Sequence, residues 1–319
     1  MSAQTQSISR QKAWVMAARP QTLPAAAAPI LVGTGVAIHD GVFAPLPALA
    51  ALLGAALIQI GTNFANDYYD AIKGADTADR EGFTRVTAGG LIDPPAVKRA
   101  MYLTFMIAIL VGATLVWVGG IPILIVGLLS VGSGIAYTGG PYPLGYHGLG
   151  DVFVFVFFGL IAVTGTYYVQ AAALIAGTFP LGIPAGTVSL TAIVASLPIA
   201  ALSTNILVVN NVRDRNEDAT TGKRTLAVRY GYTFARAEFI TLLILAYSVP
   251  IWFLSRTAYT LAVGLPLVTL PIALSVMHTI CTETAGDMLN PTLERVGKLL
   301  AGYALLFSIG LAIKTLPVV

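Results

Sequence analysis

The chain has 319 residues, of which 56% are hydrophobic and 10% are charged, and its formal net charge is +3. Soluble domains carry about 25% charged residues, so a chain this poor in charge cannot cover itself with a water-facing surface, and most of its surface must face lipid. The single cysteine, Cys281, excludes an intrachain disulfide and a cysteine-rich metal site.

Apolar segments long enough, or nearly so, to cross about 30 Å of hydrocarbon recur along the whole sequence. No stretch between them is typical of a soluble domain, so residues 1–319 are predicted to form one all-α integral membrane domain. We predict nine transmembrane helices, over residues 20–38, 47–69, 98–118, 121–138, 151–171, 190–211, 235–254, 259–281 and 296–316.

The positive charges test this topology. With nine spans, all of the 18 Lys and Arg residues except Arg256 and Lys314 fall on the side that holds the N-terminus. The positive-inside rule makes that side cytoplasmic. The long polar connections at about 70–97 and 212–234 lie there too, so a charged substrate is expected to bind at this side of a cell (cytoplasmic) membrane.

Helices 47–69 and 190–211 both leave the membrane on this side with a run of acids and asparagines. In each run the polar residues recur at helical spacing and share one face. The spacing Asn-x-x-x-Asp occurs in both, which suggests a four-helix unit used twice, as helices 1–4 and 5–8, with a ninth helix added. The first set is Asn63, Asn66, Asp67 and Asp70; the second is Asn210, Asn211, Asp214 and Asp218.

Carboxylates at this density repel one another unless a cation lies between them. Hard oxygen ligands suit Mg²⁺, which shares its coordination shell with substrate phosphates and makes a diphosphate a competent leaving group. No Lys or Arg lies between Arg99 and Arg213, so the cations that hold the phosphates must come from the loops at 70–97 and 212–234. The candidates are Lys73, Arg80, Arg85, Lys223 and Arg224.

Two further features have a functional and a structural interpretation. Tyr142 and His147 lie in a Gly- and Pro-rich loop and either contact an aromatic acceptor or simply hold the loop. The aromatic residues of the fifth helix either shield an allylic cation or face lipid and neighbouring helices. They are Phe153, Phe155, Phe157, Phe158, Tyr167 and Tyr168. No phosphate-cradling or dinucleotide-binding motif is present, and nothing in the pattern predicts a nucleic-acid partner.

These features resemble the UbiA superfamily of intramembrane aromatic prenyltransferases along essentially the whole chain. The first family motif, NDxxDxxxD, begins as Asn66-Asp67-Tyr68-Tyr69-Asp70, but position 74 is Gly and Asp76 follows two residues later. The second motif, DxxxD, runs from Asp214 to Asp218. The segments 18–24, 139–151 and 222–229 look most like the 1,4-dihydroxy-2-naphthoate polyprenyltransferase branch of menaquinone biosynthesis.

The resemblance implies a bundle of about nine helices around a central cavity that opens to lipid under a cytoplasmic cap. A polyprenyl diphosphate would be ionised with the help of Mg²⁺, and dihydroxynaphthoate would attack the allylic cation with loss of CO₂ and a proton, giving demethylmenaquinone. The metal and diphosphate ligands implied are Asn66, Asp67, Asp70, Asp76, Asp214 and Asp218. Lys73, Arg85, Lys223 and Arg224 would hold the diphosphate, and Tyr142 and His147 the acceptor.

Other functions remain open at this point. The same chemistry on another acceptor, such as 4-hydroxybenzoate, homogentisate or a chlorin, fits the same motifs. A secondary transporter would use inward-facing carboxylates to carry ions, but its site is expected near the bilayer midplane rather than at helix ends. A scaffold would leave the paired motifs unexplained.

Overall fold

The computed structural model describes residues 8–74 and 85–314, and in this part of the chain it is helical, with one isolated β-bridge between Tyr259 and Lys314. In chain order the elements are α1 (Arg10–Ala18), η1 (Pro20–Thr22), α2 (Leu23–Asp40), α3 (Pro45–Ile72), α4 (Pro94–Ala136), η2 (Leu144–His147), α5 (Gly150–Val154), the π-helical η3 (Phe155–Ile161), α6 (Ala162–Ile175), α7 (Leu190–Arg213), α8 (Arg215–Thr220), α9 (Leu226–Leu254), η4 (Leu261–Thr269), α10 (Leu270–Thr282) and α11 (Gly286–Ala312).

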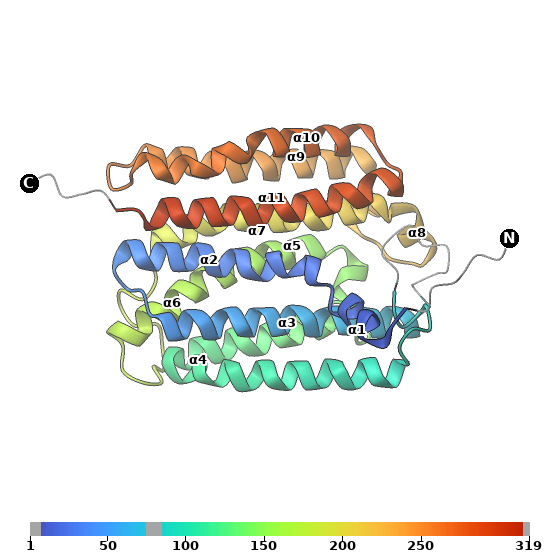
Figure 1. Cartoon of the computed structure of the whole chain (residues 1–319), viewed down its shortest axis with the longest axis horizontal. Coiled ribbons are helices and arrows are strands. Elements are labelled where there is room, and N and C mark those ends of the chain that lie inside the picture. The colour runs from blue at the N-terminus through green and yellow to red at the C-terminus, as the bar shows by residue number, and fades with distance from the viewer. Residues whose placement is uncertain (1–7, 75–84, 315–319) are drawn as a thin grey trace, which may run out of the picture.

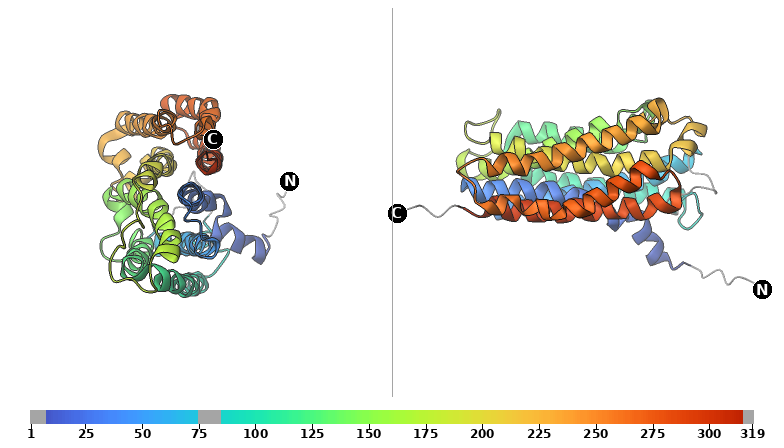
Figure 2. Two further views of the ribbon diagram at one scale, coloured as in Figure 1. Left: turned by 90° about the vertical axis from the view of Figure 1, so that its left-hand side faces the viewer. Right: turned by 90° about the horizontal axis from the view of Figure 1, so that it is seen from above.

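The long helices lie side by side with their axes nearly parallel (Figure 1), and viewed end on they follow a curved ring (Figure 2). Within the described residues, 8 helices are long and apolar enough to span a membrane, and one of them, Pro94–Ala136, has 43 residues. That helix breaks at Gly120, whose φ of 64° is left-handed. A side chain at Gly120 would collide with the backbone of Pro180. Counting both halves of α4 gives the nine predicted spans, and the all-α membrane fold is confirmed.

Two helix boundaries differ from the prediction. Helix α9 begins at Leu226 and α11 at Gly286, each about ten residues before the predicted apolar span. The prediction followed hydropathy, whereas α11 continues as polar turns beyond the apolar layer, and the start of α9 is a short helical turn separated from the long helix by a break at Gly231 (φ 82°). Both extensions lie at the end of the bundle where α3 and α7 end, which we call the charged end.

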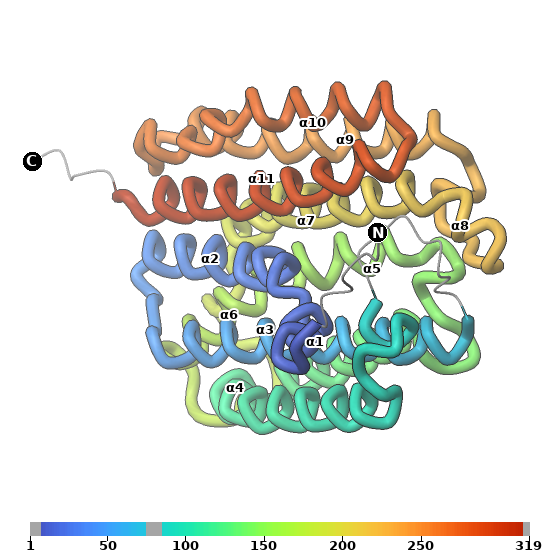
Figure 3. Tube along the Cα trace, turned by 45° about the vertical axis from the view of Figure 1, so that its right-hand side comes forward, coloured from blue at the N-terminus to red at the C-terminus, as the bar shows by residue number. Residues whose placement is uncertain are grey.

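Helix α2, by contrast, starts deep in the bundle. Gln59, three turns before the end of α3, donates a hydrogen bond to Thr22 (3.0 Å), directly before the first residue of α2. The preceding helix α1 is short and lies across the side of the bundle rather than along it (Figure 3). It packs on α3 through the buried side chains of Ala13 and Ala17.

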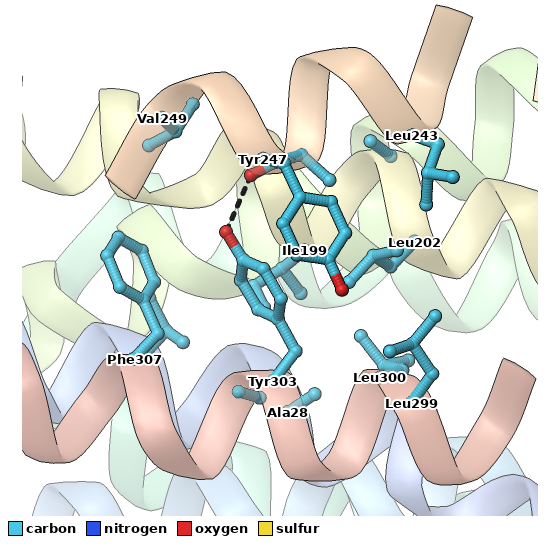
Figure 4. Close-up of a cluster of buried hydrophobic side chains, with 14 of the residues drawn as sticks. Ala28, Ile199, Leu202, Leu243, Tyr247, Val249, Leu299, Leu300, Tyr303 and Phe307 are labelled. Atoms are coloured by element: carbon cyan, nitrogen blue, oxygen red, sulfur yellow. Dashed lines mark hydrogen bonds between the residues drawn. The ribbon is translucent and has the colours of Figure 1, made fainter. Parts of the chain in front are cut away.

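A large cluster of buried apolar side chains is formed by α2, α6, α7, α9, α10 and α11. Tyr303 is fully buried there, donates to the carbonyl of Ala246 (2.6 Å) and meets the ring of Tyr247 edge to face at 5.5 Å (Figure 4). Small residues let the helices approach closely, as is usual in membrane bundles. At Gly35 in α2, an added Cβ would lie 2.7 Å from the carbonyl oxygen of Ser308 in α11. This half of the bundle is therefore a rigid wall for the cavity described next.

Candidate active site

A cavity of about 880 Å³ lies inside the bundle, between α2, α3, α4, η3, α7 and α11. Its lining changes along its length. Apolar groups from α2, α3 and α6 line the deeper part, among them Pro29, Ala55, Ile58 and Ala162. Toward the charged end the lining becomes polar and charged, with Asn63, Asn66, Asp70, Arg85, Asn210, Asn211, Asp214, Asp218 and Lys223. One end therefore suits a charged group and the other a hydrocarbon.

The two acidic runs converge at the charged end. The ammonium nitrogen of Lys223 lies 3.9 Å from Oδ1 of Asp70 on α3 and 3.8 Å from Oδ1 of Asp218 on α8. The Lys223 side chain is 12% exposed and the carboxylates are 3% and 8% exposed, so solvent screens these interactions weakly. Asp70 and Asp218, which are 148 positions apart in the chain, thus share one cation.

Asp70 has further partners. The hydroxyl of Tyr146 in η2 donates to Oδ1 of Asp70 at 2.8 Å, and a guanidinium nitrogen of Arg85 lies 3.6 Å from Oδ2. The ammonium groups of Lys73 and Lys223 each lie 5.1 Å from the centre of the Tyr146 ring, at cation–π distance. Cations and a phenol therefore surround the first carboxylate of the site.

Asp214 is fixed by its neighbour Arg213. The guanidinium of Arg213 donates to both carboxylate oxygens of Asp214, at 2.6 and 2.8 Å, and also to Oδ1 of Asn210 at 2.8 Å. A third nitrogen donates to Oδ1 of Asn290 on α11 at 3.0 Å. Because Arg213 is buried and bonded to two helices, this network ties the end of α7 to the start of α11 and sets the direction of Asp214.

The two predicted asparagines of α3, Asn63 and Asn66, lie at different depths in the bundle. Asn66 accepts a hydrogen bond from the hydroxyl of Thr138 (3.0 Å), so its amide oxygen points toward the loop after α4. Asn63 lies one turn deeper and donates to the carbonyl of Ala18 and the hydroxyl of Thr22, both at 2.9 Å. Asn63 thus joins α3 to the entry of α2, and both residues line the cavity.

Several predicted residues lie away from the cavity lining. Asp67 is 1% exposed and faces the segment at Thr87 instead. Tyr142 is 58% exposed and stacks on His147 with ring centres 3.6 Å apart, outside the lining residues. The side chain of Arg224 is exposed and likewise absent from the lining. Asp76 and Arg80 lie outside the described residues.

Lys73 lies at the mouth of the site rather than inside it. Its ammonium donates to the carbonyl of Thr138. Partial burial lowers the pKa of this ammonium, the charge of Asp70 acts in the opposite direction, and Lys223 lowers the pKa again. Lys73 therefore adds positive charge next to Asp70 while it holds the loop after α4.

Phenylalanines of the fifth span line the cavity wall. Phe153, Phe157 and Phe158 belong to the lining, and the first two rings stack at 5.6 Å. They lie at or next to the π-helical segment η3, and such segments often occur at functional sites. Tyr167 and Tyr168 are buried between helices outside the lining, and Phe155 is not a lining residue either.

Sequence reasoning missed four residues of the site. Tyr146 lies in the same loop as Tyr142 and His147, and no periodic pattern distinguishes it from them. Tyr137, at the end of α4, also lines the cavity. Arg19 and Lys298 also line the cavity. The prediction that cations reach the site only from two loops was therefore incomplete, because it counted chain segments and ignored how α1 and α11 pack.

The donor set fits Mg²⁺. Asn66, Asp70, Asn210, Asp214 and Asp218 carry amide or carboxylate oxygen atoms, and all five residues line the same end of one cavity. Within the described ranges no three His, Cys, Asp or Glu side chains form a metal cage. That arrangement suits a hard cation that takes part of its shell from substrate phosphates and water.

The fold and the cavity together define a helical membrane protein with a charged site at one end of an apolar chamber. Residues 26–287 match the model of the UbiA prenyltransferase family. The chain belongs to this family, and the predicted family and prenyl-transfer activity are confirmed.

Individual relatives agree with this assignment. The 1,4-dihydroxy-2-naphthoate octaprenyltransferase of Escherichia coli strain K12 is 39% identical over 312 residues, 96% of this chain and 97% of that protein. The enzyme of the same name from Mycobacterium leprae is 35% identical over 92% of this chain and 93% of its own length. A solved UbiA homologue from Archaeoglobus fulgidus, bound to GPP and Mg²⁺, has a TM-score of 0.60 at 16% identity, covering 93% of this chain and 99% of that one.

Proposed function

We propose that this protein transfers a polyprenyl group from polyprenyl diphosphate to 1,4-dihydroxy-2-naphthoate in a Mg²⁺-dependent reaction, with decarboxylation, in menaquinone biosynthesis. The observation that carries the proposal is Lys223, whose ammonium group lies within 3.9 Å of Asp70 and 3.8 Å of Asp218 at the polar end of an apolar cavity. The names of the relatives from Escherichia coli and Mycobacterium leprae support the choice of acceptor.

The diphosphate would bind at the charged end. Asn66, Asp70, Asp214 and Asp218 would hold Mg²⁺, which when bound withdraws electron density from the leaving diphosphate. Arg85 and Lys223 would hold the outer phosphate oxygens. The hydroxyl of Tyr146, now bonded to Asp70, keeps that carboxylate in place while the charges around it change.

The polyprenyl tail would lie in the apolar part of the cavity. The bond between its first carbon and the diphosphate oxygen breaks, and the electron pair leaves with the diphosphate. The faces of Phe153, Phe157 and Phe158 shield the allylic cation from water and stabilise it. A ring carbon of the acceptor forms the new carbon–carbon bond, the carboxyl group of the ring leaves as CO₂, and its proton is released. The product is the quinol form of demethylmenaquinone.

The site would face the cytoplasm. Nearly all cations of the chain belong to the charged end, which the positive-inside rule makes cytoplasmic. A polar diphosphate and a carboxylated acceptor reach the site from that side, whereas the tail and the product stay in the bilayer. This explains why the transfer takes place inside a membrane protein.

One assay tests the proposal. The purified protein in lipid nanodiscs is given a prenyl diphosphate and dihydroxynaphthoate, with Mg²⁺ or with EDTA, and the product mass is measured. We expect a prenylated, decarboxylated product in the reaction with Mg²⁺ and no product in the reaction with EDTA. The variants Asp70→Ala and Asp214→Ala should form no product in either reaction. Asp40→Asn, at the opposite end of the bundle, is the matched control and should keep wild-type activity. Product formation with 4-hydroxybenzoate or homogentisate in place of the naphthoate would contradict the assignment of the acceptor.

A further inference from the structure

Asp67 belongs to the first acidic motif but does not face the cavity. Asn66 and Asp70 line the cavity, whereas Asp67 lies about 100° around the helix from Asn66 and points toward α1 and the segment 85–93. Its side chain is 2% exposed. A carboxylate buried to this degree requires partners, and these partners define what it does.

The partners of Asp67 come from two other segments. Its Oδ2 accepts a hydrogen bond from the backbone N–H of Thr87 at 3.1 Å and another from the Thr87 hydroxyl. Its Oδ1 lies 4.0 Å from a guanidinium nitrogen of Arg19. Oδ2 of the carboxylate therefore has two protein donors, and Oδ1 lies at ion-pair distance from Arg19, at the edge of the face of α3 that carries Asp70.

Both segments carry a cation into the cavity. Arg85 is two residues before Thr87 and reaches Asp70, and Arg19 lies where α1 ends and η1 begins. Both arginines line the cavity. The segment after Arg85 is folded into tight turns, with Leu91 and Ile92 donating to the carbonyl of Val86, and it packs on α1 and α3. Fixing Thr87 therefore fixes the backbone from which Arg85 extends.

We propose that Asp67 is a positioning residue that places Arg85 and Arg19 for the diphosphate, and that it is not a ligand of the metal ion. The inference rests on the proposed function above and divides the first acidic motif into two roles. Asn66 and Asp70 face the substrate, and Asp67 holds the two segments that bring the arginines to it.

The experiment compares Asp67→Asn, Thr87→Val and Asp70→Asn in the full-length protein in nanodiscs. Binding of geranyl diphosphate is measured by calorimetry over a range of Mg²⁺ concentrations, and turnover is measured in parallel. Thr87→Val removes the hydroxyl but keeps the shape of the side chain, and Thr87→Ser restores the hydroxyl. Thermal unfolding in detergent shows whether each variant is folded.

We expect Asp67→Asn and Thr87→Val each to weaken geranyl diphosphate binding about 10-fold at saturating Mg²⁺, which corresponds to the loss of one well-placed ionic contact. The Mg²⁺ concentration for half-maximal binding should change less than about twofold, whereas Asp70→Asn should raise it strongly. The double variant Asp67→Asn/Thr87→Val should bind no more weakly than the weaker single variant, because both substitutions disturb the same contact between Asp67 and Thr87. Thr87→Ser should bind like the wild type.

A strong rise in the Mg²⁺ requirement of Asp67→Asn, with Thr87→Val unchanged, would make Asp67 a metal ligand and overturn the inference. Wild-type binding of geranyl diphosphate without any prenyl transfer would refute the proposed function, while the comparison of binding among the variants would still decide the role of Asp67. If the wild type does not bind geranyl diphosphate, both proposals fail.

Discussion

Replacing Lys223 by Gln tests the convergence of the two acidic runs most directly. The ammonium group lies between Asp70 on α3 and Asp218 on α8, and the Lys223 side chain is 12% exposed. Removing one partner of a buried charge pair costs about 2–5 kcal/mol. Both distances, 3.9 and 3.8 Å, exceed that of a direct hydrogen bond, so the lower part of this range applies.

A loss of about 2–3 kcal/mol corresponds to a decrease of about 30- to 150-fold in kcat/KM. We expect most of it as a rise in the KM for the prenyl diphosphate, because Lys223 would contact the bound phosphates in the ground state. Removing the cation also leaves two carboxylates facing each other. The apparent Tm of Lys223→Gln should therefore fall, and added Mg²⁺ should recover more of it than in the wild type.

The assay is steady-state prenyl transfer by purified protein in nanodiscs, with the diphosphate varied at saturating acceptor. Lys12→Gln is the matched control, because Lys12 is an exposed lysine of α1 outside the cavity lining. Lys223→Arg should keep part of the activity, since it keeps the charge. A Lys223→Gln variant within twofold of the wild type in kcat/KM would refute the reasoning that this lysine connects the two halves of the site.

Three other changes have defined outcomes. Tyr146→Phe removes the hydroxyl bonded to Asp70 but keeps the ring. The kcat/KM should fall about 10-fold, which corresponds to the loss of one hydrogen bond to a charged group. An unchanged kcat/KM would show that the hydrogen bond has no role in turnover. Arg213→Gln frees Asp214 from its bidentate partner. Titration with Mg²⁺ should show that the Mg²⁺ concentration for half-maximal activity rises at least fivefold. A fall in Tm without this rise would indicate a purely structural role. Tyr303→Phe leaves a backbone carbonyl of α9 without its donor and should lower the stability by about 1–2 kcal/mol, measured as Tm in detergent, with turnover at 25 °C unaffected.

The nine spans and the two acidic helix ends were predictable because both depend on local sequence. Hydropathy over a window of about 20 residues identifies a span, and the break at Gly120 is marked by its neighbouring glycine and proline. Helical periodicity likewise places Asn66 and Asp70 on one face. It does not separate Asp67 from them, because a carboxylate at the edge of that face can turn to either side and only the packed neighbours decide which.

The residues that sequence reasoning missed depend on contacts far apart in the chain. Tyr146, for example, reaches Asp70 across 76 residues. Arg19 lies in the cavity because α2 starts deep in the bundle and α1 turns aside, which no local signal marks.

The sequence by itself determined that this protein is a helical membrane protein with two acidic sites on one side, since burial in lipid and helix periodicity act residue by residue. Only the tertiary structure decided which carboxylates face the cavity and which cations meet them. The physical reason is that the direction of a buried polar side chain is set by the partners that satisfy its hydrogen bonds, and the packing of distant helices supplies those partners.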